Sequence, residues 1–123
     1  MARIGGNIYG EIQTNEAQKG ENGEIITNEI GESVNEWRTA ARPLGWLGFA
    51  SGEKKYSSYN AKVEESTHIF LCDFSADIYA LADRDSRMII KGFVYDVLLI
   101  DNPDEMDEQL EIYLKRVGAR QNG

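Results

Sequence analysis

Two apolar runs near the end of the chain predict a β-hairpin around which the other segments are expected to pack. Residues 88–90 form a short run and residues 93–100 a longer one. Only Lys91 and Gly92 separate them, which is the spacing of a two-residue turn, where glycine accepts a positive φ without steric cost. Because the longer run is apolar on both faces, it is expected to be a central strand.

Strict alternation assigns the side chains of the longer run to two faces of that strand. Phe93, Tyr95, Val97 and Leu99 fall on one face, whereas Ile100 falls on the other. The predicted core residues of the hairpin are Ile89, Ile90, Gly92, Tyr95, Val97 and Leu99.

The remaining sequence predicts further strands and few helical turns. Alternation and short apolar runs indicate strands over residues 4–14, 24–28, 34–42 and 66–74. Residues 15–23 are polar and contain two glycines, so a mobile loop is expected there. Residues 75–86 are compatible with a helical turn. Residues 107–117 fit a half-buried strand and an amphipathic helix equally well.

These elements predict a mainly β protein: a small antiparallel β-barrel or sandwich with at most short helical turns. Its length of 123 residues is that of one domain, and this size can bury a core without metal ions or disulfides. We expect residues 1–117 to form this single domain. Residues 118–123 are polar and are expected to form a flexible tail.

A long segment in the middle of the chain combines glycines with large aromatic side chains. Residues 45–62 contain glycines at positions 45, 48 and 52. Two interpretations remain open: an ordinary connection with self-packed rings, or a contact loop, since long loops within compact domains are usually functional. The residues expected to make the contacts are Trp46, Leu47, Phe49, Tyr56 and Tyr59.

The charge balance restricts the classes of partner. The formal net charge is -8, which argues against a surface that grips phosphate backbones, because lysine and arginine supply that affinity. No apolar run approaches the length that spans a membrane, and the first residues lack the apolar core of a signal peptide. We therefore expect a protein that is made in a reducing cytoplasm and has no membrane partner.

The chain offers no convincing constellation for chemistry. His68 is the only histidine and Cys72 the only cysteine, and both fall in a strand pattern where a structural role is expected. Asp101, Asp104 and Asp107 do not match a calcium-binding loop, because Pro103 occupies its third position and no glycine occupies its sixth. We predict no catalytic residue, no metal site and no cofactor.

The order of the segments resembles the phage head–tail joining family, which includes head-closure (stopper) and adaptor proteins. The resemblance covers roughly residues 8–117. It is carried by IQ at 12–13, NGE at 22–24, EWRTA at 36–40, PL at 43–44, SGE at 51–53 with Tyr56, STH at 66–68, RMII at 87–90, YDVL at 95–98, DNPD at 101–104 and LEIY at 110–113.

The resemblance implies a β-barrel that assembles as a homo-oligomeric ring below the portal vertex of a tailed phage. The implied partners are further copies of itself, the portal or connector adaptor, and a tail or tail-completion protein. The implied location is the head–tail interface of the virion, after synthesis in the bacterial host. Such a ring would hold packaged double-stranded DNA in the head and let it pass without tight binding. Residues 45–62 would project toward the channel or a neighbouring subunit, and residues 107–117 would be a strand.

Other functions remain open at this stage. A monomeric barrel of the SH3-like or OB-like kind could use Trp46, Phe49, Tyr56 and Tyr59 to dock a peptide or protein. A neighbouring connector adaptor or tail-completion protein is a further alternative within the same assembly. The mass of the protein in solution distinguishes a ring from a monomer.

Overall fold

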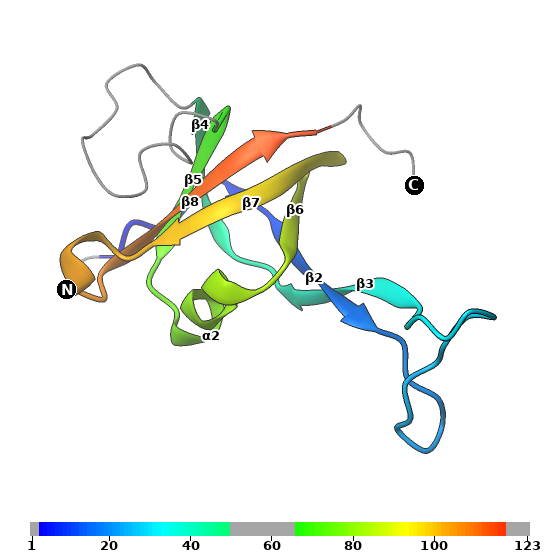
Figure 1. Ribbon diagram of the computed structural model, residues 1–123. Helices are drawn as coiled ribbons and strands as arrows, with labels where there is room; N and C mark the ends of the chain where they lie inside the picture. The colour runs from blue at the N-terminus through cyan, green and yellow to red at the C-terminus, as the bar shows by residue number, and fades with distance from the viewer. Residues whose placement is uncertain (1–2, 50–65, 118–123) are drawn as a thin grey trace.

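Eight antiparallel strands form one curled, half-barrel sheet in the computed structural model, which describes residues 3–49 and 66–117 (Figure 1). The predicted mainly β fold is confirmed. The strands are β1 (Ile8–Tyr9), β2 (Glu11–Ala17), β3 (Asn35–Ala41), β4 (Leu44–Phe49), β5 (His68–Asp73), β6 (Ser86–Ile90), β7 (Phe93–Asp101) and β8 (Gln109–Arg116), and their order across the sheet is β1-β4-β5-β8-β7-β6-β2-β3.

The sheet curls because β1 and β2 form one almost continuous stretch of strand, and its two parts pair with distant parts of the sheet. Only Gly10 separates β1 from β2, yet β1 pairs with β4 and β2 pairs with β6. The backbone N–H of Gly10 donates to the carbonyl of Pro43 at 3.0 Å, so the ladder continues through this point. A Cβ on Gly10 would collide with the terminal methyl of Met88. Glycine therefore allows the strand to pass close over the core.

The predicted hairpin is confirmed as β6 and β7. Its turn residues Lys91 and Gly92 have φ values of 51° and 82°, the pair of positive values that a type I′ turn requires. On its other side β7 pairs with β8, so β7 is central, as expected. Residues 107–117, which the pattern left ambiguous, contain strand β8, because pairing with both β5 and β7 covers its backbone.

A β-bulge in β7 corrects part of the predicted core. Val97 pairs with Leu114 and Leu99 with Tyr113, so one extra residue lies on β7 between these pairs. The bulge reverses the alternation beyond it. Ile100 therefore points into the core, whereas Leu99 is half-buried and lies outside the core cluster.

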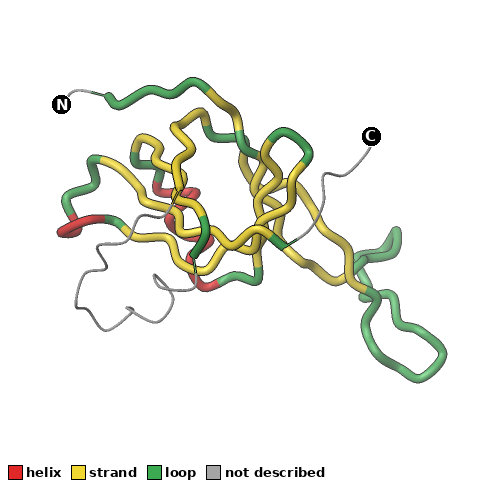
Figure 2. Tube along the Cα trace, turned by 90° about the horizontal axis from the view of Figure 1, so that it is seen from above, coloured by secondary structure: helices red, strands yellow, loops and turns green. Residues whose placement is uncertain are grey.

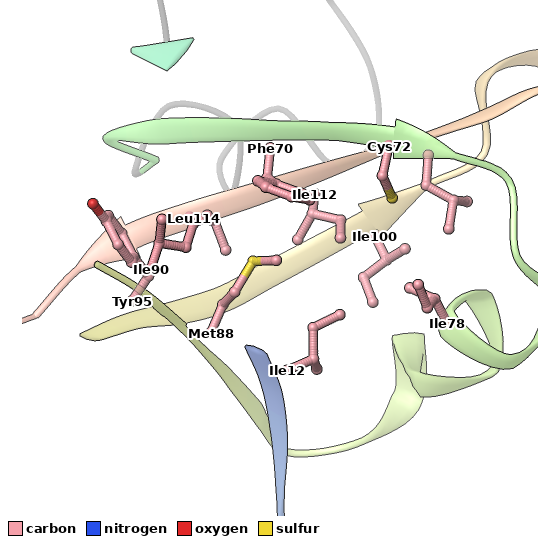
Figure 3. Packing of buried hydrophobic residues seen from close by; sticks show 11 residues of the cluster. Ile12, Phe70, Cys72, Ile78, Met88, Ile90, Tyr95, Ile100, Ile112 and Leu114 are labelled. Carbon is pink, nitrogen blue, oxygen red and sulfur yellow. The ribbon is translucent and has the colours of Figure 1, made fainter. Parts of the chain in front are cut away.

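The core lies inside the curl of the sheet (Figure 3). Of the predicted hairpin residues, Ile90 and Tyr95 belong to it and Val97 packs against it, whereas Ile89 is half-buried and lies outside it. The full cluster consists of Ile12, Phe70, Cys72, Ile78, Met88, Ile90, Tyr95, Ile100, Leu110, Ile112 and Leu114.

One short helix covers an end of the core. The Ser75 hydroxyl accepts a hydrogen bond from the N–H of Ile78 and so caps α2 (Ala76–Tyr79), which continues into the 3-10 turn η1 (Ala80–Asp83). Ile78 points into the core (Figure 3). A second 3-10 turn, η2 (Pro103–Glu105), joins β7 to β8. Within the described residues, no helix has the length and apolar character needed to cross a bilayer.

Two predictions for the N-terminal part are wrong. Residues 15–17 were expected in a mobile loop but extend β2, because they pair with β3. Residues 24–28 were expected to be a strand, but they make only isolated bridges, Lys19 with Ile25 and Thr27 with Ser33. The strand over residues 34–42 is confirmed as β3, and that over 66–74 as β5.

Candidate functional site

The first part of the predicted contact loop is a strand in the sheet. Residues 44–49 form β4, which pairs with β1 and with β5. Its glycine at position 45 is buried: a Cβ there would collide with the carbonyl oxygen of Leu71 and lie 2.6 Å from the ring of Phe70. Glycine at this position marks close packing rather than a flexible joint. The remainder of the segment, residues 50–62, lies outside the described residues, as do Tyr56 and Tyr59.

The three predicted contact residues of β4 differ in exposure. Leu47 packs against the core. Trp46 points outward and is 45% exposed, and its indole Nε1 donates to the carbonyl of Ile4 at 2.8 Å. Phe49 ends the strand with 82% of its surface exposed. Trp46 and Phe49 are therefore exposed, whereas Leu47 is half-buried.

A surface hollow of about 320 Å³ lies over β4 and β5. Its lining is mainly apolar, and the carboxylate of Glu111 on β8 stands at its side. The lining residues are Trp46, Leu47, Gly48, Phe49, Ile69, Leu71 and Glu111. Such a hollow can accept an apolar side chain or a short peptide.

His68 lies between two aromatic rings at the start of β5. The ring of Phe49 is 4.8 Å away and that of Tyr95 is 5.1 Å away, centre to centre. Its Nδ1 is 2.9 Å from the hydroxyl of Thr67. Burial, together with the nearby positive charge of Arg116, lowers the pKa of His68 below its ordinary value of 6.5.

We expect acidification through pH 6.5 to lower the stability of the folded protein. The unfolded chain binds a proton at His68 near its ordinary pKa of 6.5, whereas the folded chain binds it only at lower pH. The contribution of neutral His68 to the free energy of unfolding is therefore fully present above pH 6.5. It is lost as the pH falls toward the pKa of His68 in the folded protein. Thermal melts across this range test it, with His68→Gln as the comparison. If the melting temperature falls equally with pH in the wild type and in His68→Gln, the pH dependence does not come from His68.

The thiol of Cys72 is unsuited to nucleophilic chemistry. Burial, with the carboxylate of Asp73 beside it, raises its pKa to about 11. The thiolate form is therefore scarce at neutral pH. Within residues 3–49 and 66–117, no three histidine, cysteine, aspartate or glutamate side chains are grouped as metal ligands.

An arm that the sequence analysis did not predict projects from the sheet. It comprises residues 18–34 between β2 and β3, and it extends away from the barrel in both views (Figures 1 and 2). Three parts of the arm meet at its base. The N–H of Ile26 donates to Gln18 at 2.8 Å, that of Val34 donates to Ile26 at 2.9 Å, and that of Gln18 donates to Val34 at 2.7 Å. These bonds hold the arm in a defined shape.

The arm displays apolar side chains among carboxylates. The side-chain oxygen of Asn28 accepts hydrogen bonds from the N–H groups of Ile30 and Glu32, at 3.1 and 3.0 Å, and Gly31 has a φ of 87°. This turn presents Ile30 with 79% of its surface exposed. Ile25 and Ile26 are exposed as well, and glutamates occupy positions 21, 24, 29 and 32.

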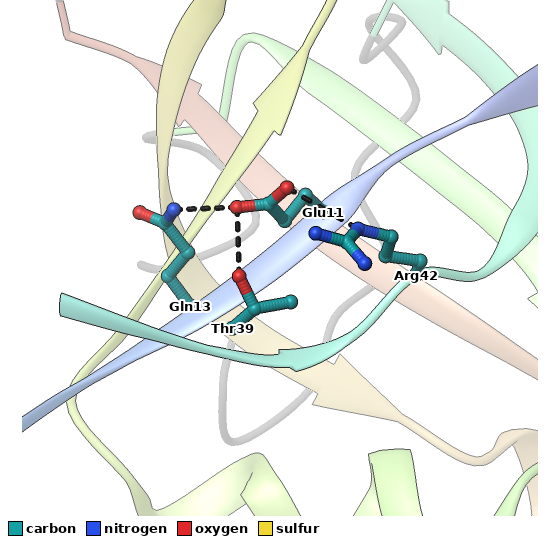
Figure 4. Close-up of polar contacts among 4 residues, drawn as sticks. All are labelled: Glu11, Gln13, Thr39 and Arg42. Carbon is teal, nitrogen blue, oxygen red and sulfur yellow. Dashed lines mark hydrogen bonds and ion pairs between the residues drawn. The ribbon is translucent and has the colours of Figure 1, made fainter.

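A polar network joins β2 to β3 at the barrel end of this strand pair, the end away from the arm. The Glu11 carboxylate accepts hydrogen bonds from Gln13 at 2.6 Å, Thr39 at 2.9 Å and Arg42 at 3.4 Å (Figure 4). These contacts, the bonds from Gln13 and Thr39 first, lower the pKa of Glu11. The guanidinium of Arg87 lies 4.4 Å from the ring centre of Trp37 on β3. The orientation of the arm is therefore set by β2, β3 and β6.

The opposite end of the barrel is aromatic and basic. Lys91 occupies the β6–β7 turn, and Lys115 and Arg116 end β8 beside the start of β7. The Arg116 guanidinium lies 3.6 Å from the ring centre of Phe93. Phe49 reaches this end through the register from β4 to β5 and from β5 to β8. We refer to Lys91, Lys115, Arg116, Phe49 and Phe93 as the basic end.

Sequence reasoning found Phe49 but neither the arm nor the basic end. Asn28 and Gly31 are residue types typical of a turn, and Ile30 lies between them. Two glutamates, Glu29 and Glu32, are close to this isoleucine in the chain. The arm could have been predicted from these signals. In comparisons with known proteins, no family model and no curated protein sequence matches this chain.

Proposed function

We propose that this protein is a structural subunit that assembles into a ring in a phage head–tail connector, where it closes the head and receives the tail. The observation that carries the proposal is the hydrogen-bonded arm with exposed isoleucines on a small β-barrel. Holding apolar side chains in water on an ordered projection is unfavourable, so a partner surface is expected to cover them. The order of segments that resembles head–tail joining proteins supports this particular assembly.

The charge of the chain is compatible with a channel for DNA. With a formal net charge of -8, a ring of such subunits repels phosphate groups and lets a duplex slide. The proposed partners are further copies, the portal or connector adaptor above, and a tail or tail-completion protein below.

A monomeric binding module is the second candidate function, and the hollow over β4 and β5 favours it. Trp46, Ile69 and Leu71 line that hollow, which suits an apolar peptide side chain. A monomer that binds such a peptide needs no second copy, so the mass of the protein in solution separates the two functions.

We expect the protein to form a complex of several copies, either alone at high concentration or on a purified portal connector ring. Light scattering across a concentration series, with and without the connector, measures the mass of the particles. Strictly monomeric protein under every condition would contradict the proposed ring and favour the monomeric binding module.

A further inference from the structure

We propose that the arm of one copy of this chain docks on the basic end of a second copy, head to tail. The inference rests on the proposed function in one respect, because it names the contact that would build the ring. Charge, exposed apolar surface and the placement of the two surfaces in the fold support this contact.

The two surfaces are complementary in charge. Residues 18–34 contain four glutamates and one lysine, Lys19, which gives the arm a formal charge of -3. Lys91, Lys115 and Arg116 contribute three positive charges to the basic end, where Asp96 lies opposite Lys115 and leaves a balance of +2. Opposite potentials favour encounter and fix the orientation of docking. A chain with a net charge of -8 otherwise repels its own copies, so this local match decides how copies meet.

The two surfaces also match in apolar character. Ile30 is 79% exposed at the tip of the arm, and Phe49 is 82% exposed at the basic end. Glu29 and Glu32 are close to Ile30 in the chain. The strand register places Phe49 at the same end of the barrel as Lys115 and Arg116. Burying both side chains against each other removes apolar surface from water at the centre of the contact and leaves the charges at its rim.

The geometry requires a second copy. In the register of β2 with β6, Glu11 lies opposite Ile89, and Thr14 lies opposite Ser86. The arm follows the end of β2 that lies beyond Thr14. The turn with Lys91 follows the end of β6 that lies beyond Ile89, which is the opposite end of this strand pair. The arm of one copy thus points away from its own basic end (Figure 1). A contact between two different surfaces of identical chains repeats, and it closes into a ring when its rotation allows.

Charge exchange tests this contact. The arm variant carries Glu29→Lys and Glu32→Lys, and the basic-end variant carries Lys91→Glu and Lys115→Glu. All four positions are exposed, so the barrel should retain its melting temperature. We expect each variant alone to associate at least about tenfold more weakly than the wild type, measured by sedimentation at low ionic strength. An equimolar mixture should associate again, because each arm then meets a basic end of opposite charge.

Two further variants complete the test. Asp77→Lys with Asp83→Lys changes the net charge by the same amount on the helical side of the barrel, and it should not reproduce the loss seen with the arm variant. Ile30→Ser should weaken association by about 10- to 100-fold, since it removes the apolar centre of the contact.

The outcomes separate this inference from the proposed function. Where the wild type assembles only on a connector ring, the same variants are compared on that ring. Two results would overturn the proposed docking without contradicting the proposed ring subunit. One is assembly that neither charge reversal weakens, and the other is a mixture of folded variants that does not associate. Loss of connector binding alone would assign the arm to the connector and also overturn it. A wild type that never assembles overturns both.

Discussion

Replacing Gly45 by alanine is expected to lower the free energy of unfolding by about 3 kcal/mol, a large part of the roughly 5–15 kcal/mol typical of a domain. The added methyl group would collide with the carbonyl oxygen of Leu71 and lie 2.6 and 2.7 Å from two atoms of the Phe70 ring. Because the first obstacle is backbone, β4 and β5 must separate to accept it. Urea unfolding followed by circular dichroism measures the change.

Gly48 provides the matched control within the same strand. Among the residues that the structure describes, no heavy atom lies within 4 Å of a Cβ on Gly48, so Gly48→Ala should change the stability by no more than about 0.5 kcal/mol. Similar losses for both variants would mean that β4 does not lie against β5 as described.

The second large effect is expected from Ile100→Asp, which should unfold the protein at room temperature. Ile100 is 4% exposed within the core, and an unpaired carboxylate there costs several kcal/mol. Leu99→Asp should cost only about 1 kcal/mol, since Leu99 is half-buried and outside the core cluster. Melting temperatures of the two variants compare them directly. Without the bulge in β7, Leu99 would face the core, and Leu99→Asp would be the more destabilising of the two substitutions. A larger loss of stability for Leu99→Asp than for Ile100→Asp would therefore argue against the bulge.

The hairpin could be predicted from sequence because its signals are local. Lys91 and Gly92 are the two residues of the turn, and both adopt the positive φ that this turn needs. The assignment of Leu99 to the core failed for a different reason. A bulge shifts the register by one residue, and alternation along a single strand does not reveal where pairing with the neighbouring strand shifts.

The glycines of β4 show how one residue type supports opposite predictions. Their density was interpreted as a loop, yet Gly45 is buried where two strands and a phenylalanine ring approach closely. Whether a glycine supplies flexibility or leaves room depends on the residues packed against it. Those residues, Phe70 and Leu71, are more than twenty positions away in the chain. No local pattern contains this information.

The arm was not predicted because its isoleucines lie in a polar segment. Ile25 and Ile26 were interpreted as a short strand, which would bury them, but the structure leaves both exposed. The turn around Asn28 is recognisable from sequence as a turn, whereas its projection from the barrel depends on the pairing of β2 with β3.

Sharing one strand between two ends of the sheet has a consequence for the order of folding. Ile12 pairs with Met88, and the N–H of Ile4 donates to the carboxylate of Asp73, 69 residues further along the chain. Such distant partners make folding slow, because the loop must close before the contact forms. During synthesis on the ribosome, β2 and β3 are made long before β6. The apolar side chains on the core-facing side of β2 therefore stay exposed until β6 has been made. We expect a nascent chain that stops before Ile90 to aggregate through that strand.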